Sequence, residues 1–445
     1  MGWHVVIAGG GFGGFYAARR LERVLPPQSA RVTLITADNF LLFSPLLPGA
    51  AAGTLEPRHV VIPLREELER TEIVLGRVTG LDAGARSIRY TSVDGDEEEL
   101  DYDHVILGLG SVTRVPPIPG LADHGYGFKT LADAVALRNR AVLNLEIAES
   151  LEDPEQRRQF LNFVFVGAGY AGVEGIAELQ DYVADVIDRY PRCRLDGTRW
   201  VIADREERIM REISPGLADF AARELRRRGI EVRPRTGLQS VEADRVTLSD
   251  GEVVPTRLLC WTAGVRPPPV VADLGLPLSE DGRVATGSTL RVEGHDDVWA
   301  IGDMAAVPDP AKGGGAPTPP TAQHALRQGR LAADNVAAAL GHGRIREFRY
   351  KTLGVFVDLG RHQAVAEMLG VKLRGFPAWW AARTYHLALM PGPVRRIRLL
   401  VDWTVGLFFG RASAELGQLG HPPPLHGATS ADDPSRALAN TPDGG

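Results

Sequence analysis

Two glycine-rich turns constrain this chain more than any other feature of its sequence. One occupies residues 9–14 and reads Gly-Gly-Gly-Phe-Gly-Gly, and the other occupies residues 167–172 and reads Gly-Ala-Gly-Tyr-Ala-Gly. Each follows a short apolar stretch and precedes a helical pattern, which is the context that G-x-G-x-x-G requires. The first glycine makes the tight turn, the second lets the backbone approach a pyrophosphate, and the third lets the helix pack on the strand. The sequence therefore predicts two dinucleotide sites, built on Gly9, Gly11 and Gly14 in the first turn and on Gly167, Gly169 and Gly172 in the second.

The same order of elements recurs around both turns. After the first turn we expect a helix over residues 15–24, a strand over 31–35, a hairpin at 94–95 and a closing strand that ends near Gly110 and Ser111. After the second turn the corresponding segments are 173–189, 199–203, 250–251 and a closing strand that ends at Gly264. Alternating strands and helices form parallel sheets with helices on both faces. The predicted fold class is α/β, with two Rossmann-like dinucleotide-binding domains, one inserted into the other.

Charge and hydropathy exclude some classes of partner. The chain has 445 residues, a formal net charge of −6 and a sequence pI of about 6.0, which gives no support for a nucleic-acid partner. It has no run of 18 uncharged apolar residues, so we expect no membrane-spanning helix. The first strand begins at Trp3 and leaves no room for a signal peptide, so the sequence predicts a cytoplasmic protein.

Cysteine and histidine usage exclude two further kinds of chemistry. The two cysteines, Cys193 and Cys260, form no C-x-x-C pair, whereas a dithiol reductase needs two close cysteines. Both are therefore expected to be structural. The histidines show no metal-ligand spacing, so we predict no metal site.

An acid at the end of the strand after a glycine turn ordinarily binds the adenosine ribose. In the first half this place is taken by Thr36, and Asp38 and Asn39 follow it as the nearest polar candidates. In the second half Asp204 stands there and favours NADH, because its charge would repel the 2′-phosphate of NADPH. The neighbouring Arg205 weakens this preference for NADH over NADPH. The alternative role for Asp204 is that of a solvated acid in a turn.

Local motifs in the right order identify a relative. Beyond the glycine turns, the chain resembles the type II NADH:quinone oxidoreductases over residues 3 to about 411, in the stretches 43–48, 53–56, 172–174, 261–267, 300–303 and 320–323. This resemblance implies a glutathione-reductase-like fold with one non-covalent FAD in the first half and NADH as substrate in the second. It implies FAD-binding segments at residues 1–120 and 265–345, a connecting segment at 121–160, an NADH-binding domain at 161–264 and a C-terminal unit at 346–412.

The resemblance also implies roles for three further residues. Asp303 is expected to bind the ribityl and phosphate region of the flavin, and Gln323 to lie under the isoalloxazine near the quinone. Glu174 is expected beside the contact between nicotinamide and flavin. From the residues alone, Asp303 could instead cap the following helix, and Glu174, placed on the first turn of its helix, could simply stabilise that helix end. The family commonly has two adjacent glutamines where this chain has Arg327 and Gln328.

The segment from 372 to 411 differs in composition from the rest of the chain. It carries seven Lys and Arg against one acid, Asp402, with aromatic residues between them. We expect one helix over 378–389, a stop at 391–393 and a second helix toward Phe409. Interleaved Trp, Tyr and Arg are typical of helices that lie in the membrane interface. We therefore predict membrane contact through residues 376–411. A homodimer interface, which also uses Trp and Arg, is the alternative or an addition, and we expect disorder over 413–445.

The predicted function is that of an FAD-dependent enzyme that oxidises NADH and reduces a membrane quinone without proton pumping. The protein would lie on the cytoplasmic side of the cell membrane as a peripheral protein. Glu174, water or His324 could bring protons to the quinone. Two alternatives remain open: a soluble NAD(P)H-dependent reductase of another acceptor, similar to ferredoxin reductases, and a redox sensor that binds both dinucleotides without turnover.

Overall fold

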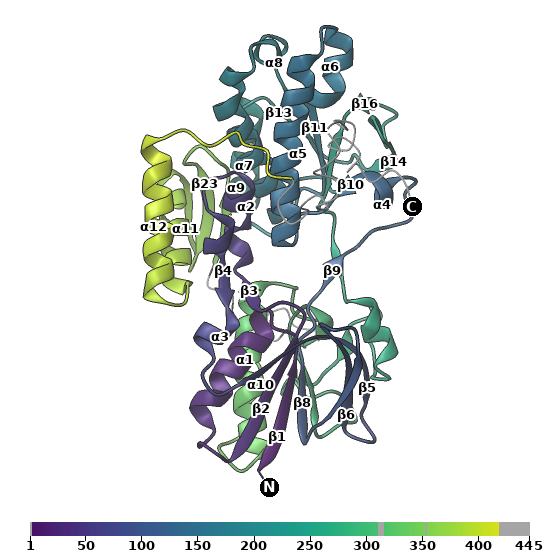
Figure 1. The fold of residues 1–445 in the computed structure, drawn as a ribbon, viewed down its shortest axis with the longest axis vertical. Coiled ribbons are helices and arrows are strands. Elements are labelled where there is room, and N and C mark those ends of the chain that lie inside the picture. Colours follow the sequence, from purple (N-terminus) through teal and green to yellow (C-terminus); the bar gives the residue numbers. More distant parts are fainter. Residues whose placement is uncertain (1, 310–315, 352–353, 418–445) are drawn as a thin grey trace, which may run out of the picture.

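The computed structural model describes residues 2–309, 316–351 and 354–417. Figure 1 shows two α/β units, one above the other, with a third, smaller unit beside them. The expected disorder over 413–445 falls largely on residues 418–445, which lie outside the described residues.

The first unit is built on a seven-stranded sheet in the order β20-β8-β1-β2-β5-β6-β7. The five strands from β20 to β5 are parallel, and β6 and β7 extend the sheet as antiparallel hairpins. The strands are β1 (Trp3–Ala8), β2 (Ala30–Thr36), β5 (Glu72–Asp82), β6 (Ser87–Ser92), β7 (Glu97–Asp101), β8 (His104–Leu107) and β20 (Val298–Ala300). The predicted hairpin at 94–95 connects β6 and β7.

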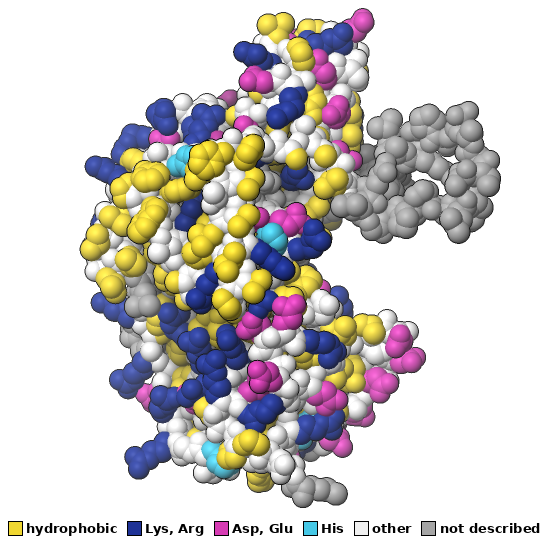
Figure 2. All heavy atoms as spheres, turned by 60° about the vertical axis from the view of Figure 1, so that its left-hand side comes forward, with side chains coloured by type: hydrophobic (Ala, Val, Ile, Leu, Met, Phe, Trp, Pro, Cys, Tyr) yellow, Lys and Arg dark blue, Asp and Glu magenta, His cyan; other side chains and the backbone are white. Residues whose placement is uncertain are grey.

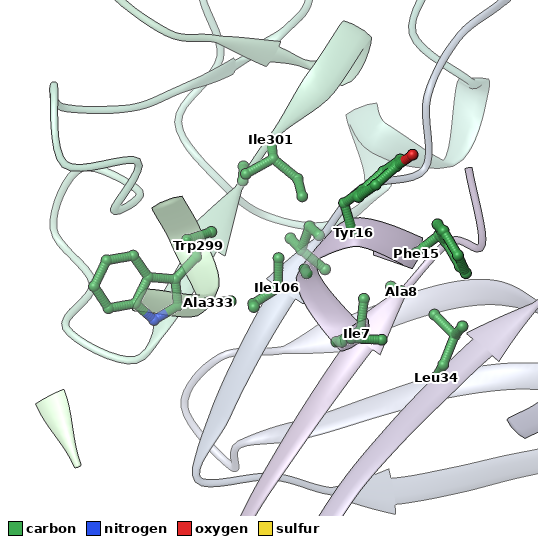
Figure 3. Close-up of a cluster of buried hydrophobic side chains, with 14 of the residues drawn as sticks. Ile7, Ala8, Phe15, Tyr16, Leu34, Ile106, Trp299, Ile301 and Ala333 are labelled. Atoms are coloured by element: carbon green, nitrogen blue, oxygen red, sulfur yellow. The ribbon is translucent and has the colours of Figure 1, made fainter. Parts of the chain in front are cut away.

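Helices α1 (Phe12–Val24) and α10 (Ala322–Ala339) pack against each other in the first unit. The central strands are buried along almost their whole length because a parallel sheet is covered on both faces. Figure 3 shows how side chains of the sheet and of these helices meet in one core, among them Ile7, Ala8, Phe15, Tyr16, Leu34, Ile106, Trp299, Ile301 and Ala333.

The second unit contains a five-stranded parallel sheet in the order β10-β17-β11-β12-β13. Its strands are β10 (Gly125–Tyr126), β11 (Asn162–Val166), β12 (Arg199–Ala203), β13 (Ile230–Arg233) and β17 (Leu258–Trp261). Its helices are α4 (Leu121–His124), α5 (Leu131–Ser150), α6 (Pro154–Leu161), α7 (Tyr170–Val186), α8 (Pro191–Asp196) and α9 (Pro215–Arg227). A meander of β14 (Leu238–Glu242), β15 (Arg245–Leu248) and β16 (Val253–Pro255) completes it, with the predicted turn at 250–251 between the last two strands.

The segment 121–160, expected as a connection, is an integral part of this second unit. Its strand β10 forms one edge of the sheet, and α5 buries Leu137, Ala141 and Leu145 in the core. These residues recur at intervals of four, so they lie on one face of the helix.

Two short strands connect the first and second units. They are β9 (Val112–Thr113) and β18 (Val265–Arg266), and they pair with each other in antiparallel fashion. The second unit is therefore an insertion into the first, as the sequence predicts. Another segment also extends from the first unit toward the second. It contains β3 (Phe40–Leu42), α2 (Leu47–Ala51) and β4 (Val61–Pro63), and its helix α2 packs on α5 and α7.

The third unit is an antiparallel sheet of β22 (Gly354–Asp358), β23 (Ala364–Met368) and β24 (Val371–Gly375), covered by α11 (Phe376–Leu389). Helix α12 (Pro393–Phe408) follows after a break at Gly392, whose φ of +79° places it in the left-handed region. Both helices agree with the expected ones to within about two residues.

After α12 the chain returns across the second unit. The Arg411 guanidinium contacts Asp181 at 2.7 Å, and the carbonyl of Ala412 accepts hydrogen bonds from Tyr182 and Arg138, both at 2.9 Å. The amide of Leu416 donates to Asn139. The chain is therefore still packed on α5 at Leu416, beyond the predicted start of the tail. In the described part of the chain, no helix combines the length and the hydropathy that a membrane span needs.

Candidate functional site

The first glycine turn has the geometry of a phosphate-binding turn. Gly9 has a φ of +104°, and a Cβ atom there would lie 2.3 Å from the carbonyl oxygen of Gly108. A Cβ atom on Gly14 would lie 1.8 Å from the carbonyl oxygen of Gly9, so helix and turn are in direct contact. At Gly11, by contrast, a Cβ atom would meet no atom of the described residues within 4 Å. The first and third glycines are thus required by packing, and the second faces open space.

The second turn repeats this arrangement. Gly167 has a φ of +107°, a Cβ atom on Gly172 would lie 1.9 Å from the carbonyl oxygen of Gly167, and one on Gly169 would again meet no described atom within 4 Å. Helices α1 and α7 both begin with no side-chain cap from the described residues and with no acid in the first turn. Their first N–H groups and the positive ends of their dipoles are therefore available to an anion.

A cavity of about 540 Å³ opens over the first turn. The predicted residues that line it are Gly9, Gly11, Thr36, Asp38, Gly110, Ser111 and Asp303. The Thr36 hydroxyl donates to the carbonyl of Asp38 at 2.9 Å, so it holds the end of β2. Asn39 is exposed and outside the lining, and Gly14 supports the turn from behind.

Asp303 lies in this cavity within a small polar network. The Ser111 hydroxyl donates to Asp303 at 2.6 Å, and the Lys129 ammonium donates to Ser111 at 2.9 Å. Burial lowers the pKa of Lys129, against the raising effect of Asp303 and Asp133. The helix-cap alternative for Asp303 is wrong for α10, because Thr321 caps that helix. Sequence reasoning missed Lys129, although it is one of only four lysines in the chain.

A second cavity, of about 450 Å³, opens over the second turn. Of the predicted residues, Gly167, Gly169, Asp204 and Gly264 line it, together with Arg205. The Asp204 carboxylate accepts hydrogen bonds from the backbone N–H groups of Ala168 and Glu206. Asp204 is therefore not merely a solvated turn acid, because it ties the glycine turn to the end of β12.

Glu174 does not stabilise the start of its helix. Helix α7 begins at Tyr170, three residues earlier than predicted, which moves Glu174 to the second turn. Its carboxylate accepts a hydrogen bond from the backbone N–H of Asp358 at 3.0 Å. Burial raises the pKa of Glu174 to about 8, and the hydrogen bond from Asp358 opposes that rise. The helix-end interpretation is therefore wrong, and Glu174 lines a small cavity of about 40 Å³ between α7, β22 and α11.

Gln323 holds the start of α10 against the third unit. Its amide donates to the carbonyl of Gly354 at 2.9 Å and accepts from the Tyr350 hydroxyl at 2.6 Å. It does not line the first cavity, whereas its neighbours Ala322 and Ala325 do. Arg327 and Gln328 stand where the family commonly has two adjacent glutamines. The Arg327 guanidinium stacks 4.0 Å from the centre of the Tyr350 ring, and the buried Gln328 side chain accepts a hydrogen bond from the backbone N–H of Gly302.

Both cysteines are buried and free. Burial raises the pKa of Cys193 to about 12 and that of Cys260 well above its usual value, so both stay protonated thiols. Neither lines one of the cavities described above. Within the described residues, no group of three or more His, Cys, Asp and Glu side chains is placed to hold a metal ion.

Comparison with known proteins agrees with this architecture. The family model of the pyridine nucleotide-disulphide oxidoreductases matches residues 3–329. Demethylphylloquinone reductase NdbB from Synechocystis is 30% identical over 409 residues, which cover 90% of this chain and 95% of the relative. Type II NADH:quinone oxidoreductase Ndh from Mycobacterium tuberculosis is 30% identical over 420 residues, with coverage of 90% and 87%.

The fold has a close counterpart among solved structures. NDH2 from Plasmodium falciparum, solved in complex with NADH, matches with a TM-score of 0.86 at 19% identity, and the match covers 93% of this chain and all of that one. Because the match extends past residue 329, it includes the third unit as well as the two dinucleotide-binding units. The chain belongs to the pyridine nucleotide-disulphide oxidoreductase family and, within it, to the type II NADH:quinone oxidoreductases.

Proposed function

We propose that this protein binds FAD in the first cavity and NADH in the second, and that it passes electrons from NADH to a quinone without pumping protons. The observation that carries the proposal is the duplicated turn: two helix starts, each with an uncapped positive end and with open space at its second glycine, in a chain of this family. Two dinucleotides held by one chain are suited to exchange electrons.

The residues of the first cavity fit FAD. Open space at Gly11 leaves room for the pyrophosphate against the start of α1. Asp303 and Ser111 offer a charged acceptor and a hydroxyl to a ribityl chain, and Lys129 contributes a cation beside them. Asp38, rather than Thr36 or Asn39, offers the carboxylate to the adenosine ribose. A bound flavin supplies the chemistry that this chain lacks, since it accepts a hydride from a nicotinamide and releases two electrons to an acceptor.

The second cavity fits a nicotinamide dinucleotide. Gly169 leaves room for its pyrophosphate, and Gly264 lines the same cavity. Asp204 places a carboxylate at the end of β12, where it would repel the 2′-phosphate of NADPH, which supports NADH over NADPH. Gln323 and Glu174 lie where the third unit packs on the other two: Gln323 fixes α10 to β22, and Glu174, on α7, presents a carboxyl group with a raised pKa.

The outer surface of the C-terminal helices supports a lipid-dissolved acceptor. Figure 2 shows hydrophobic side chains gathered on this side of the molecule, with Lys and Arg beside them. The exposed apolar residues of these helices are Phe376, Trp380, Leu389, Val394, Ile397, Leu400, Val401, Val405, Leu407 and Phe408. Apolar and cationic side chains on one helical face suit the interface of an anionic bilayer. We propose that residues 376–411 bind the membrane there as a peripheral anchor, on the cytoplasmic side predicted from the sequence.

A homodimer seam is a second use for the same face. The mass of the protein in solution, measured by light scattering with and without a mild detergent, separates the two uses. A protein that remains a dimer in detergent and does not bind vesicles indicates that this face is only a dimer interface. A monomer that binds vesicles supports the membrane surface alone.

Anaerobic stopped-flow spectroscopy tests the proposed function. The purified protein should be yellow, its flavin should bleach on mixing with NADH faster than with NADPH, and a quinone should restore the colour. Protein that takes up no flavin contradicts the whole proposal. Protein whose reduced flavin reacts with a ferredoxin but with no quinone supports the soluble-reductase alternative, and protein that NADH does not bleach supports the sensor.

A further inference from the structure

Helices α1 and α10 bring arginines from two distant parts of the sequence onto one surface of the first unit. The helices are in direct contact, because a Cβ atom on Gly329 would lie 2.1 Å from the carbonyl oxygen of Gly13. Arginines spaced by three or four residues on each helix share one of its faces. The arginines of the two helices are Arg19, Arg20, Arg23, Arg327 and Arg330.

The acids of these helices neutralise little of this charge. Helix α1 has one acid, Glu22, whose carboxylate accepts hydrogen bonds from the backbone N–H groups of Arg70 and Thr71, both at 2.8 Å. Helix α10 has one acid, Asp334, which pairs with Arg20 at 2.6 Å. Only Arg20 among the five arginines therefore has an acidic partner on the two helices.

The other four arginines, Arg19, Arg23, Arg327 and Arg330, form what we call the arginine patch. Arg19 contacts Glu67 at 3.5 Å. The remaining three form no ion pair within the described residues, so three positive charges of the patch are uncompensated.

Aromatic rings hold two of these guanidinium groups close to the helices. Arg330 lies 4.9 Å from the centre of the Tyr16 ring, and Arg327 lies 4.0 Å from that of Tyr350. Partial burial lowers the pKa of Arg330, Tyr16 opposes this, and the like charges of the other three patch residues lower the pKa further. The patch is therefore a local concentration of positive charge that an anionic partner would stabilise.

The arginine patch continues toward the start of α12. Glu67 pairs with Arg19 of the patch and also with Arg395 of α12, so one carboxylate connects the two helices. On α12 itself, Arg398 is exposed next to the exposed Ile397. Figure 2 shows a group of Lys and Arg side chains directly below the hydrophobic surface, and Figure 1 places α1 below α12 on the same side of the molecule.

The shape of this surface suits an extended anionic partner. None of the patch residues lines one of the cavities described above, so the patch offers no pocket for a single small anion. Its charges instead lie on the outer faces of two helices, beside the apolar surface of α12. A bilayer with acidic lipids presents many phosphates in one plane and attracts cations that come within a Debye length of it.

We propose that the arginine patch binds the phosphate groups of anionic phospholipids, so that the first unit contacts the bilayer together with α12. This inference rests on the proposed function, because it extends the membrane contact of residues 376–411 to α1 and α10. A single helix lying in the interface leaves a protein free to roll about the axis of that helix. A second contact, on another unit, fixes the tilt and holds the unit with the proposed flavin site against the membrane.

Arg23→Gln and Arg330→Gln test the patch in sedimentation with vesicles of phosphatidylglycerol and phosphatidylcholine. We expect each change to weaken binding about five-fold and the double variant to weaken it about twenty-fold. Binding to vesicles of phosphatidylcholine alone should stay at the wild-type level, because these vesicles carry no net charge. The matched control is Arg89→Gln, on β6 of the same unit: Arg89 is exposed and forms no ion pair within the described residues.

Two further measurements separate a loss of charge from a loss of structure. Arg330→Lys keeps the charge and should keep wild-type binding, and added salt should remove the difference between the wild type and Arg330→Gln. Flavin content and melting temperature of the purified variants report whether they fold. If the double variant does not fold, the two single variants decide.

A fluorescent label reports the position of the patch independently of affinity. Both native cysteines are buried, so a thiol-reactive dye labels an introduced cysteine selectively. On vesicles, a dye on Arg23→Cys should be quenched by lipids with spin-labelled headgroups. A dye on Val93→Cys, in the turn between β6 and β7, should not be quenched.

The outcomes distinguish the patch from the membrane contact as a whole. Equal quenching at both positions, or wild-type binding of both patch variants to anionic vesicles, would overturn the inference and leave an acidic protein as the partner of this surface. A wild type that binds no vesicles of either composition would instead contradict the proposed membrane contact of residues 376–411.

Discussion

At the scale of single residues, Gly11 and Gly169 allow phosphate binding to be separated from folding. Both have extended backbone, and a Cβ atom at either would meet no described atom within 4 Å, so we expect the fold to tolerate valine there. We expect Gly169→Val to weaken NADH binding at least ten-fold, about 1.4 kcal/mol, with unchanged flavin content. Gly11→Val should instead abolish flavin binding. Titration calorimetry with NADH and the flavin absorbance of the purified variants measure these two effects.

Gly14→Ala is the contrasting change in the same turn. The added methyl group would lie 1.8 Å from the carbonyl oxygen of Gly9 and would separate helix from strand. We expect a loss of about 1–3 kcal/mol in the free energy of unfolding, typical of overpacking, whereas the valine variants should change it by less than about 1 kcal/mol. Urea unfolding of the three variants, measured side by side, compares their free energies of unfolding and tests this expectation. Equal stability of all three would contradict the packing role of the third glycine.

Single residues were also where sequence reasoning reached its limit. The glycines of both turns follow from a local pattern, because strand, turn and helix are neighbours in the chain. Glu174 and Asp358 come into contact only because α7 and β22 pack together, and no pattern near either residue in the sequence predicts that contact. Glu174 shows the same limit on a smaller scale, because an error of three residues in the helix start changed its expected role.

At the scale of elements, α12 carries a continuous apolar stripe. Val394, Ile397, Val401, Val405 and Phe408 recur at three- and four-residue intervals and are exposed, Ile397 by 60%. Residues at this spacing lie on one helical face. We expect Ile397→Glu to reduce binding to vesicles of phosphatidylglycerol and phosphatidylcholine at least ten-fold in sedimentation, because a charge replaces an apolar contact with lipid.

A control for the stripe is available on a distant hairpin. Val93, exposed by 68%, lies in the turn between β6 and β7. Val93→Glu should leave vesicle binding at its wild-type level. If both variants bind alike, α12 is not the membrane contact.

Helix α12 is fastened to the first unit by Arg395. Its buried guanidinium contacts Glu66 at 2.7 Å and also pairs with Glu67, at α3 (Leu64–Glu67). We expect Arg395→Ala to lower the free energy of unfolding by about 3 kcal/mol, because it removes a buried guanidinium and leaves the half-buried Glu67 with only its longer contact to Arg19 at 3.5 Å. Trypsin should then cut faster at Arg396 and Arg398. Urea unfolding and limited proteolysis check this, with Arg398→Ala, on the exposed face, as the control that keeps wild-type stability.

Elements with a periodic pattern were predictable, and their partners were not. The bounds of β12 agree with the prediction because four consecutive apolar residues, 200–203, are followed directly by the acid Asp204. Helices α11 and α12 agree because Pro-Gly-Pro separates them in the sequence. The packing of α5 into the second unit was not predicted. The sequence of a helix that packs on a sheet can look the same as that of a connecting helix until the position of the sheet is known.

At the scale of the whole molecule, the buried acids make stability depend on pH. The pKa of Glu174 is about 8 in the folded chain against an ordinary value of 4.5. The folded state therefore binds this proton more tightly than the unfolded state does. Its contribution to stability is complete below pH 4.5, decreases as the pH rises, and is lost above pH 8. The slope in this window approaches about 1.4 kcal/mol per pH unit for each such group.

Glu174→Gln should therefore flatten this decline. We expect the melting temperature of the wild type to decrease from about pH 5 to about pH 8 more steeply than that of the variant, measured by calorimetry without added cofactors. Glu224→Gln should keep the wild-type slope, because the hydrogen bond from Arg227 lowers the pKa of Glu224 and moves its effect to more acidic pH. Parallel curves for wild type and Glu174→Gln would contradict a protonated Glu174.

The paired crossing strands β9 and β18 have a consequence for how such a molecule can be rebuilt. The chain leaves the first unit at Thr113 and re-enters it at Val265, and these two residues face each other in the same ladder. The points where the chain leaves and re-enters the first unit are therefore adjacent. An inserted domain with adjacent ends can be exchanged for another, or deleted and replaced by a short turn, without a change in the strand order of the host sheet. Recombination between relatives could therefore swap the donor-binding half as a single cassette.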